Sequence, residues 1–316
     1  MLRVRLGLVW ASGRAQRAAR IVVRRDGRAD ERSIANAERK TRERENAPTR
    51  ERENARTRER ENARTRERAN SVDVLGVRVD DVTYAEALGV LLQAIEARVP
   101  HVVTTPNPEF VMLARRDASF RAVLNRAALN IPDGIGLILA ARLAGAGLRE
   151  HVQGTDLVLM LAEASARLGY RWYLLGGRGD VAHRAARALS AQFPGLLVAG
   201  ATAGSPRRDD DAATQAAIRA VGRVDVLLVA YGAPQQELWL DRNLADLEIP
   251  VGIGVGGVFD YFSGAVPRAP GWVRRLHFEW LYRLIRQPWR WRRQLALPVF
   301  AALALGHAVR RRLRRG

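Results

Sequence analysis

From residue 71 to residue 255, short apolar and β-branched runs alternate with longer amphipathic segments, and this alternation constrains the fold more than any other feature. The short runs are typical of buried strands and the longer segments of helices. Strands that alternate with helices of this length imply βαβ units. The sequence therefore predicts an α/β fold with a Rossmann-like, mostly parallel sheet flanked by helices. We expect strands or hairpins at 72–79, 101–105, 129–132, 171–175, 196–201, 224–231 and 251–255, and helices at 84–98, 108–127, 135–143, 155–168, 180–193, 209–221 and 235–247.

Charge is distributed unevenly and divides the chain into three parts. Residues 1–70 carry a net charge of +10, residues 71–266 carry −3, and residues 267–316 carry +12, with 13 Arg and a single acid, Glu279. A nearly neutral body between two basic ends differs from an evenly basic nucleic-acid binder. We therefore predict an α/β domain over 71–266, a basic appendage over 267–316 and a separate basic arm over 1–70.

The arm over 1–70 has low complexity. Near-identical units of eight residues begin at Thr41, Thr49, Thr57 and Thr65. This period gives a helix no fixed apolar stripe, and the units hold almost no large apolar residue. We therefore expect the arm to be disordered, with a solvated helix that carries Glu–Arg pairs as the alternative. It lacks the apolar stretch of a secretory signal. We also hypothesise that the native protein starts after this arm, which N-terminal sequencing from the host would test.

Residue composition and motif spacing exclude several kinds of chemistry. The chain has no cysteine, so disulfides, thiolate metal sites and a cysteine nucleophile are excluded. No apolar run reaches the ~18 residues that a membrane-spanning helix needs. The five histidines show no metal-ligand spacing, and the acids at 209–211 are typical of a helix start, although they match a metal-binding Asp-x-Asp motif. We expect neither a metal nor a cofactor.

Polar residues follow two of the predicted strands and are candidates for a site. Asp133 comes directly after the strand at 129–132, and Thr105 and Asn107 flank Pro106 after the strand at 101–105. Ligands of parallel sheets bind beyond the carboxyl ends of the strands, where an acid can act as a general base. Each residue also has a simpler interpretation, because Asp and Asn cap helices and Pro fits the first helical position.

Two further clusters follow later strands. Gly176, Gly177 and Gly179 join a strand to a helix, and their backbone N–H groups could approach a diphosphate. A tight turn without a ligand explains the same glycines. Gln236 and Glu237 begin another helix and suit recognition of sugar hydroxyls, although a solvated first helical turn is the plainer interpretation.

The appendage over 267–316 interleaves arginine with tryptophan, and four of the seven Trp lie within twenty residues. Arg283, Arg286, Arg290 and Arg293 share one stripe of a helix, which Pro288 is expected to break. An apolar stretch over 295–309 follows, too short to span a bilayer. Aromatic residues combined with arginine are typical of a helix that lies in a membrane interface. A solvated charged helix docked on the body and a tail that binds single-stranded nucleic acid are the alternatives, and the acidic body and the apolar stretch favour the membrane surface.

Six ordered segments carry a resemblance to a known family. They are Thr105-Pro-Asn-Pro-Glu109, Pro132-Asp-Gly-Ile-Gly136, Leu174-Leu-Gly-Gly177, Gly232-Ala-Pro-Gln-Gln-Glu237, Gly254-Val-Gly-Gly-Val-Phe-Asp260, and Arg268-Ala-Pro through Glu279-Trp-Leu-Tyr-Arg283. In this order and spacing, from about residue 72 to residue 298, the chain resembles the WecG/TagA/CpsF family of bacterial glycosyltransferases.

The resemblance implies an inverting transferase, peripherally bound at the inner face of the bacterial plasma membrane. It would move a sugar, often N-acetylmannosamine, from a UDP-sugar donor to a polyprenyl-diphosphate-linked acceptor in cell-surface polysaccharide synthesis. Asp133 would be the general base, with Thr105 and Asn107 beside it and Gln236 as a sugar contact. Arg283, Arg290 and Arg293 would clamp the diphosphate of the acceptor. The donor sugar, the acceptor saccharide and the oligomeric state, a homo-oligomer included, stay open.

A binding protein and an oxidoreductase are the alternatives to a transferase. A nucleic-acid-binding or nucleotide-binding protein would use both basic ends, and comparing anionic liposomes with single-stranded DNA at physiological salt would separate it from the transferase. An NAD-linked oxidoreductase lacks support, because no Gly-x-Gly-x-x-Gly with a ribose-binding acid follows the first strand.

Overall fold

The computed structural model of the chain describes residues 70–313, with the side chains of residues 290, 311 and 312 outside the description. The low-complexity arm and its expected disorder lie outside the described residues. A six-stranded sheet in the order β4-β3-β8-β7-β5-β6 forms the centre, and every pairing in it is parallel. Its strands are β3 (His101–Thr104), β4 (Leu129–Asn130), β5 (Arg171–Gly176), β6 (Leu197–Thr202), β7 (Val226–Ala230) and β8 (Val251–Gly254).

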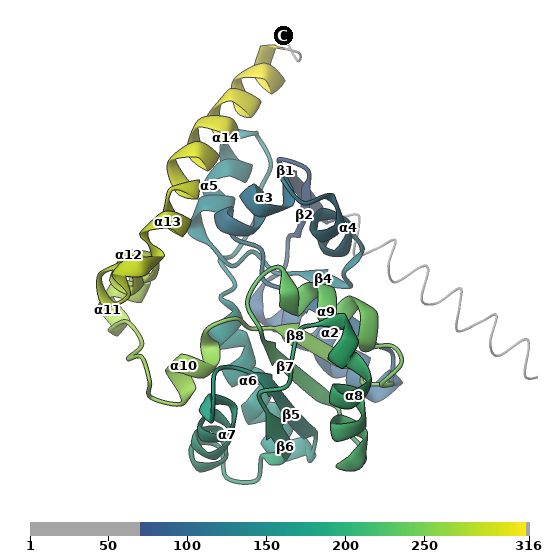
Figure 1. The fold of residues 1–316 in the computed structure, drawn as a ribbon. Coiled ribbons are helices and arrows are strands. Elements are labelled where there is room, and N and C mark those ends of the chain that lie inside the picture. The colour runs from purple at the N-terminus through teal and green to yellow at the C-terminus, as the bar shows by residue number, and fades with distance from the viewer. Residues whose placement is uncertain (1–69, 314–316) are drawn as a thin grey trace, which may run out of the picture. The chain divides into compact units, whose positions relative to one another are not determined.

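Helices flank this sheet, as the alternating pattern predicts (Figure 1). The predicted α/β class with a parallel sheet is confirmed. The helices of the body are α2 (Tyr84–Ala97), α3 (Pro108–Ala114), α4 (Ala118–Arg126), α5 (Ile135–Leu143), α6 (Gly154–Leu168), α7 (Val181–Gln192), α8 (Asp211–Ala220), α9 (Gln235–Asn243) and α10 (Val258–Phe262), with a short 3-10 turn η1 (Arg208–Asp210) before α8.

The segment at 72–79 forms a hairpin that stays separate from the parallel sheet. Its strands β1 (Ser71–Val74) and β2 (Val77–Asp80) pair antiparallel across Leu75 and Gly76. Gly76 has a positive φ of 93°, which glycine adopts without steric cost. The hairpin packs its valines into a cluster with α3, α4 and α5, next to the sheet edge formed by β4.

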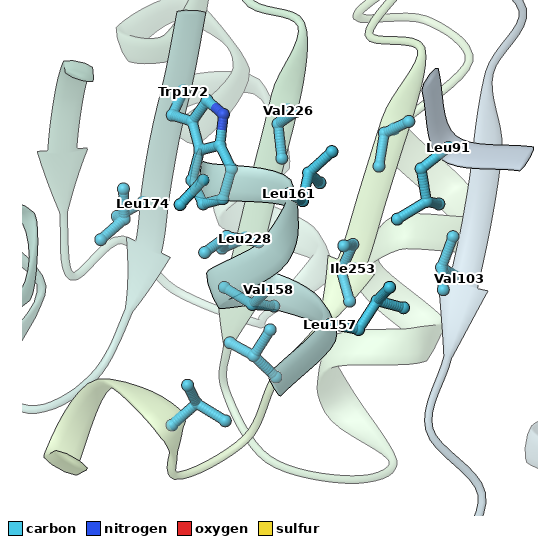
Figure 2. Close-up of a cluster of buried hydrophobic side chains, with 14 of the residues drawn as sticks. Leu91, Val103, Leu157, Val158, Leu161, Trp172, Leu174, Val226, Leu228 and Ile253 are labelled. Atoms are coloured by element: carbon cyan, nitrogen blue, oxygen red, sulfur yellow. The ribbon is translucent and has the colours of Figure 1, made fainter. Parts of the chain in front are cut away.

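Most strands are buried on both faces, which explains their continuous apolar sequence. One hydrophobic cluster packs α2, α6 and α7 against one face of the sheet (Figure 2). A second cluster packs α8 and α9 against the other face, with Trp239 fully buried. Each fully buried Leu, Ile or Val contributes about 1.5–3 kcal/mol relative to exposure. These two layers fix the strand ends from which the candidate site residues project.

The appendage folds into helices that return to the body. They are α11 (Gly271–Arg275), α12 (Glu279–Arg286), α13 (Trp291–Gln294) and α14 (Ala296–Leu313), with a 3-10 turn η2 (Pro288–Arg290) after α12. The predicted break at Pro288 is confirmed, because α12 ends at Arg286. Helix α14 packs on α3 and α5 and buries Phe300 and Ala304 among their apolar residues (Figure 1). Within residues 70–313, no helix is both long enough and apolar enough to cross a bilayer.

Two predicted helix boundaries were wrong. The helix expected over 108–127 is two helices, because Asp117 leaves the helix and its side chain accepts a hydrogen bond from the backbone N–H of Phe120. The helix expected over 155–168 begins at Gly154, with Gln153 as its N-cap, and no side chain caps it. At the N-terminus of α6, the backbone N–H of Gly154 donates instead to the Asp133 carboxylate in the candidate site.

Candidate active site

A pocket of about 550 Å³ opens beyond the carboxyl ends of β3, β4, β7 and β8. Most of the polar residues predicted for the site line it, although they come from segments far apart in the sequence. The helices α3, α5 and α14 form one wall, and α10 and α12 contribute to the other. Its polar lining includes Thr105, Asn107, Glu109, Asp133, His151, Gln153, Gln236, His277, Glu279, Arg283, Arg293 and Gln294.

Asp133 lies in this pocket, just before α5. Gly134 is the N-cap of α5 and makes no side-chain cap, so the interpretation of Asp133 as a helix cap is wrong. The Asp133 carboxylate accepts a hydrogen bond from the backbone N–H of Gly154 at the start of α6. Burial raises the pKa of Asp133 to about 7, and the charges of Glu279 and Asp156 add to that increase. A carboxyl group with this pKa can accept a proton near neutral pH.

Thr105 and Asn107 lie beside Asp133 at the end of β3. Thr105 is buried, and its methyl group packs against Gly154, where a larger residue would overlap it. Asn107 caps α3, because its Oδ1 accepts a hydrogen bond of 3.1 Å from the backbone N–H of Phe110. The capping interpretation of Asn107 is therefore confirmed, and the same residue also lines the pocket.

Gln236 and Glu237 are buried at the start of α9, so the interpretation as a solvated first turn is wrong. The Oε1 of Gln236 accepts hydrogen bonds from the backbone N–H groups of Gly232, at 3.0 Å, and Gly256, at 2.9 Å. Its amide nitrogen donates to Glu237 at 2.6 Å. Gln236 thus connects the loops that follow β7 and β8 and lines the pocket. Glu237 lies behind it, fully buried and off the pocket lining, which makes a direct sugar contact by Glu237 a wrong expectation.

We predict that Gln236→Ala destabilises the fold measurably. The buried Glu237 carboxyl and the half-buried N–H groups of Gly232 and Gly256 would lose their hydrogen-bond partner. Each such loss costs about 1–3 kcal/mol. Chemical denaturation should show a free energy of unfolding lower by at least about 2 kcal/mol. Gln235→Ala is the matched control, since Gln235 is exposed, and equal stabilities of the two variants would contradict the prediction.

The glycine turn after β5 does not reach the pocket. Gly176, Gly177 and Gly179 all have positive φ, and a Cβ on Gly176 would lie 2.7 Å from the Ala230 backbone. Close packing against β7 thus explains Gly176. Four strand spacings separate β5 from β4, which is about 19 Å from the strand that Asp133 follows. A leaving diphosphate has to lie next to the reacting sugar, so we do not retain this turn as its binding site.

Two of the three predicted arginines, Arg283 and Arg293, line the pocket. Arg283 stacks over the Tyr261 ring at 4.9 Å, with a nitrogen 3.9 Å from Asp260. Arg293 forms an ion pair of 2.9 Å with Glu109. The backbone of Arg290 lies in η2 between them, and its side chain is outside the described part. As the predicted break at Pro288 implies, Arg283 and Arg293 lie on different helices, α12 and α13.

Sequence reasoning missed a polar cluster that joins the appendage to the body. The Nδ1 atoms of His151 and His277 are 3.0 Å apart, so one ring donates a hydrogen bond to the other. Gln153 donates to Glu279 at 3.2 Å, which leaves the single acid of the appendage facing the site. Burial lowers the pKa of His151 to about 4, and His277 adds to that decrease. The isolation of Glu279 among 13 arginines was the signal that could have found this cluster.

The acidic residues at 209–211 take the surface position expected of them. Asp211 forms an ion pair of 2.8 Å with Arg242 at the start of α8. Among residues 70–313, no three His, Asp or Glu side chains gather as metal ligands would.

Comparison with known proteins assigns this arrangement to a class. The family model described as the glycosyl transferase WecG/TagA/CpsF family matches residues 72–314, and the chain belongs to this family. It is a glycosyltransferase, as the resemblance implied. The match favours this function over the nucleic-acid-binding alternative.

Three named relatives carry the same description, N-acetylglucosaminyldiphosphoundecaprenol N-acetyl-beta-D-mannosaminyltransferase. The protein of Bacillus subtilis (strain 168) is 36% identical over 67% of this chain and 81% of its own length. That of Bacillus spizizenii is 33% identical over 65% and 79%. That of Staphylococcus aureus (strain MW2) is 27% identical over 72% and 90%.

Proposed function

We propose that the protein is an inverting glycosyltransferase that moves a sugar, N-acetylmannosamine or a related hexose, from a UDP-sugar to a polyprenyl-diphosphate-linked saccharide. The names of its relatives support this donor and acceptor class. One observation carries the proposal: a carboxyl group with a pKa of about 7 lies in a pocket to which an arginine-rich appendage adds its side chains.

Asp133 is the general base in this proposal. It takes the proton from the acceptor hydroxyl while that oxygen attacks the anomeric carbon and UDP leaves from the opposite face, which inverts the configuration. A base whose pKa lies near the working pH combines the correct protonation state with sufficient basicity. Thr105, Asn107 and the remaining N–H of Gln236 line the same space and are proposed to bind the sugars.

Arg283 and Arg293 are proposed to hold the diphosphate of the acceptor. In the structure their charges are partly balanced by Asp260 and Glu109. Guanidinium groups match phosphate oxygens in a bidentate way, so a diphosphate would be a stronger partner than these carboxylates. Arg290 is proposed as the third member of the clamp, on the strength of its place between them.

We propose different roles for the body and the appendage. The body over 71–266 supplies the base, and the appendage over 267–316 supplies the diphosphate clamp and binds the membrane surface. Exposed Trp272, Trp289 and Trp291 support the membrane contact, since Trp together with Arg is suited to the headgroup region. A peripheral position fits an acceptor that is anchored in the bilayer.

A donor screen tests the proposed function. Purified protein would be given UDP-N-acetylmannosamine, its uronic acid and UDP-glucose, each with an N-acetylglucosaminyl acceptor on a short prenyl diphosphate. We expect UDP release that depends on the acceptor for one donor, and a product whose anomeric configuration is opposite to that of the donor. Retention of configuration, or UDP release that ignores the acceptor, would contradict the proposal.

We predict that the rate of transfer rises with pH through about 7. The pKa of Asp133 is raised to about 7, so the base is protonated and inactive below that value and free above it. His151 does not add to this limb, because its pKa is lowered to about 4. The pH profile of kcat/KM for the acceptor measures this limb, because kcat/KM reports the pKa values of the free enzyme. A flat profile from pH 5.5 to 8.5 would speak against Asp133 as the base.

A further inference from the structure

One half of the pocket is an apolar groove between α5 and α14, two helices that lie side by side (Figure 1). Leu139 and Leu143 line it from α5, and Leu297, Ala301 and Ala304 line it from α14. The alanines leave the space open between the two helices. The face of α5 from Ile135 to Leu143 is about 12 Å long. None of the described residues along this half is charged.

The groove starts at the polar half of the pocket and ends at the surface. Asp133 stands just before the first turn of α5, and Arg293 stands just before α14, so both mark the inner end. At the outer end the two leucines of α5 are 50% and 42% exposed. A molecule lying in the pocket would meet the acid and the guanidinium groups at one end and a purely apolar channel toward the other.

This order matches the chemistry of a lipid-linked sugar. Such an acceptor has a sugar hydroxyl at one end, a diphosphate next to it, and a branched hydrocarbon chain beyond the diphosphate. We propose that the α5–α14 groove binds the first isoprenoid units of the acceptor, and that the enzyme thereby recognises the lipid itself in addition to the sugar and the diphosphate. The inference rests on the proposed function and adds a lipid subsite to it.

The groove is distinct from the membrane contact of the appendage. Leu305 and Val309 also lie on α14 and are exposed, but they do not line the pocket. A side chain that only contacts the bilayer acts through its apolar surface. A side chain that lines the groove acts through the space it leaves free. One substitution that fills the groove but adds apolar surface, and one that removes apolar surface but leaves the groove open, can therefore separate lipid binding from membrane contact.

Ala301→Phe and Leu305→Gln form this pair. Ala301→Phe adds apolar surface and fills the groove. Ala301 is exposed, so the fold should tolerate the larger side chain. Leu305→Gln removes apolar surface on the same helix, at a side chain that is 54% exposed, and leaves the groove open. Leu139→Gln with Leu143→Gln makes a third variant, which keeps the groove open and lowers its affinity for hydrocarbon.

The affinity for farnesyl diphosphate, compared with the affinity for inorganic diphosphate, tests whether the groove binds hydrocarbon. This comparison needs no vesicles, detergent or turnover. We expect the wild type to bind farnesyl diphosphate at least about tenfold more tightly, because several buried CH₂ groups contribute. Ala301→Phe and the double leucine variant should lose this preference, and Leu305→Gln should keep it. Affinity for inorganic diphosphate should stay the same in all variants.

Transfer assays then compare acceptors that carry a farnesyl or a methyl group on the diphosphate. Ala301→Phe should raise KM for the farnesyl acceptor alone, with kcat unchanged. If the wild type transfers sugar to neither acceptor, the proposed function fails. The binding of farnesyl diphosphate then still shows whether the groove is a lipid subsite. Equal binding of both diphosphates by the wild type, or an unchanged preference in Ala301→Phe, would overturn the inference. An oligomer that Ala301→Phe dissociates, without any farnesyl preference, would assign the groove to a second copy of the chain instead.

Discussion

Asp133→Asn should reduce kcat by about 10²–10⁴-fold, the usual contribution of a positioned general base. Asn is close to Asp in size and can still accept the hydrogen bond from the N–H of Gly154, so the pocket should keep its shape. It has no basic oxygen that could take the proton of the acceptor. We therefore expect unchanged binding of UDP and of the acceptor, measured by calorimetry, together with the loss of turnover.

The stability of the same variant provides the control. A carboxyl whose pKa is raised in the folded state binds its proton more tightly than in the unfolded chain. Its contribution to stability therefore falls as the pH rises from about 4 to about 7. Asp133→Asn removes this effect and should melt at a higher temperature than the wild type at pH 8. A variant that is inactive and also less stable would mean that Asp133 supports the fold, and one with near-normal turnover would exclude it as the base.

Arg283→Ala should lower kcat/KM for the acceptor by roughly 10- to 150-fold. This range follows from about 1.5–3 kcal/mol for hydrogen bonds to a charged group. Arg283→Lys should recover only part of the loss, because an ammonium group cannot form the bidentate contact. Initial rates at varied acceptor concentration measure the effect. An unchanged KM for the donor should accompany it, since the clamp is proposed for the acceptor.

Gly257→Ala tests the same clamp from the opposite side. The guanidinium of Arg283 lies across Gly257, and an added Cβ would overlap it. The backbone of Gly257, with φ −83°, accepts any residue, so the overlap with Arg283 is the main effect of the substitution. Gly257→Ala should therefore reduce kcat/KM in the wild type and do little in the Arg283→Ala background. Gly271→Ala is the matched control, with no atom closer than 4.0 Å. A loss of equal size in both backgrounds would show that Arg283 is not the cause.

The parallel sheet could be predicted because most of its strands are largely apolar, as strands covered by helices on both faces are. The position of Asp133 and of Asn107 followed from the rule that strand ends share one edge. The order of the strands did not follow. Without it, the turn at Gly176 seemed as near to Asp133 as Thr105 is, although the sheet places β5 and β4 four positions apart.

Contacts between segments that are distant in the sequence could not be predicted either. His151 and His277 are 126 residues apart and meet only because the appendage returns to the strand ends. The burial of Glu237 depends on Gly254, whose missing side chain leaves room for the carboxyl group. Charge predicted that the appendage would be basic, and its Trp content predicted exposed aromatic residues. Neither property indicated that Phe300 packs into the body next to Phe110.

The return of α14 to the body has a consequence for the timing of biosynthesis. Helices α3 and α5 leave the ribosome well before α14, the helix that covers them, because α14 follows them far along the chain. Chains fold from the N-terminus as they are made, so these apolar faces stay uncovered until α14 has been translated. A partly translated chain without α14 therefore lacks one wall of the pocket, and the pocket is complete only after α14 has emerged.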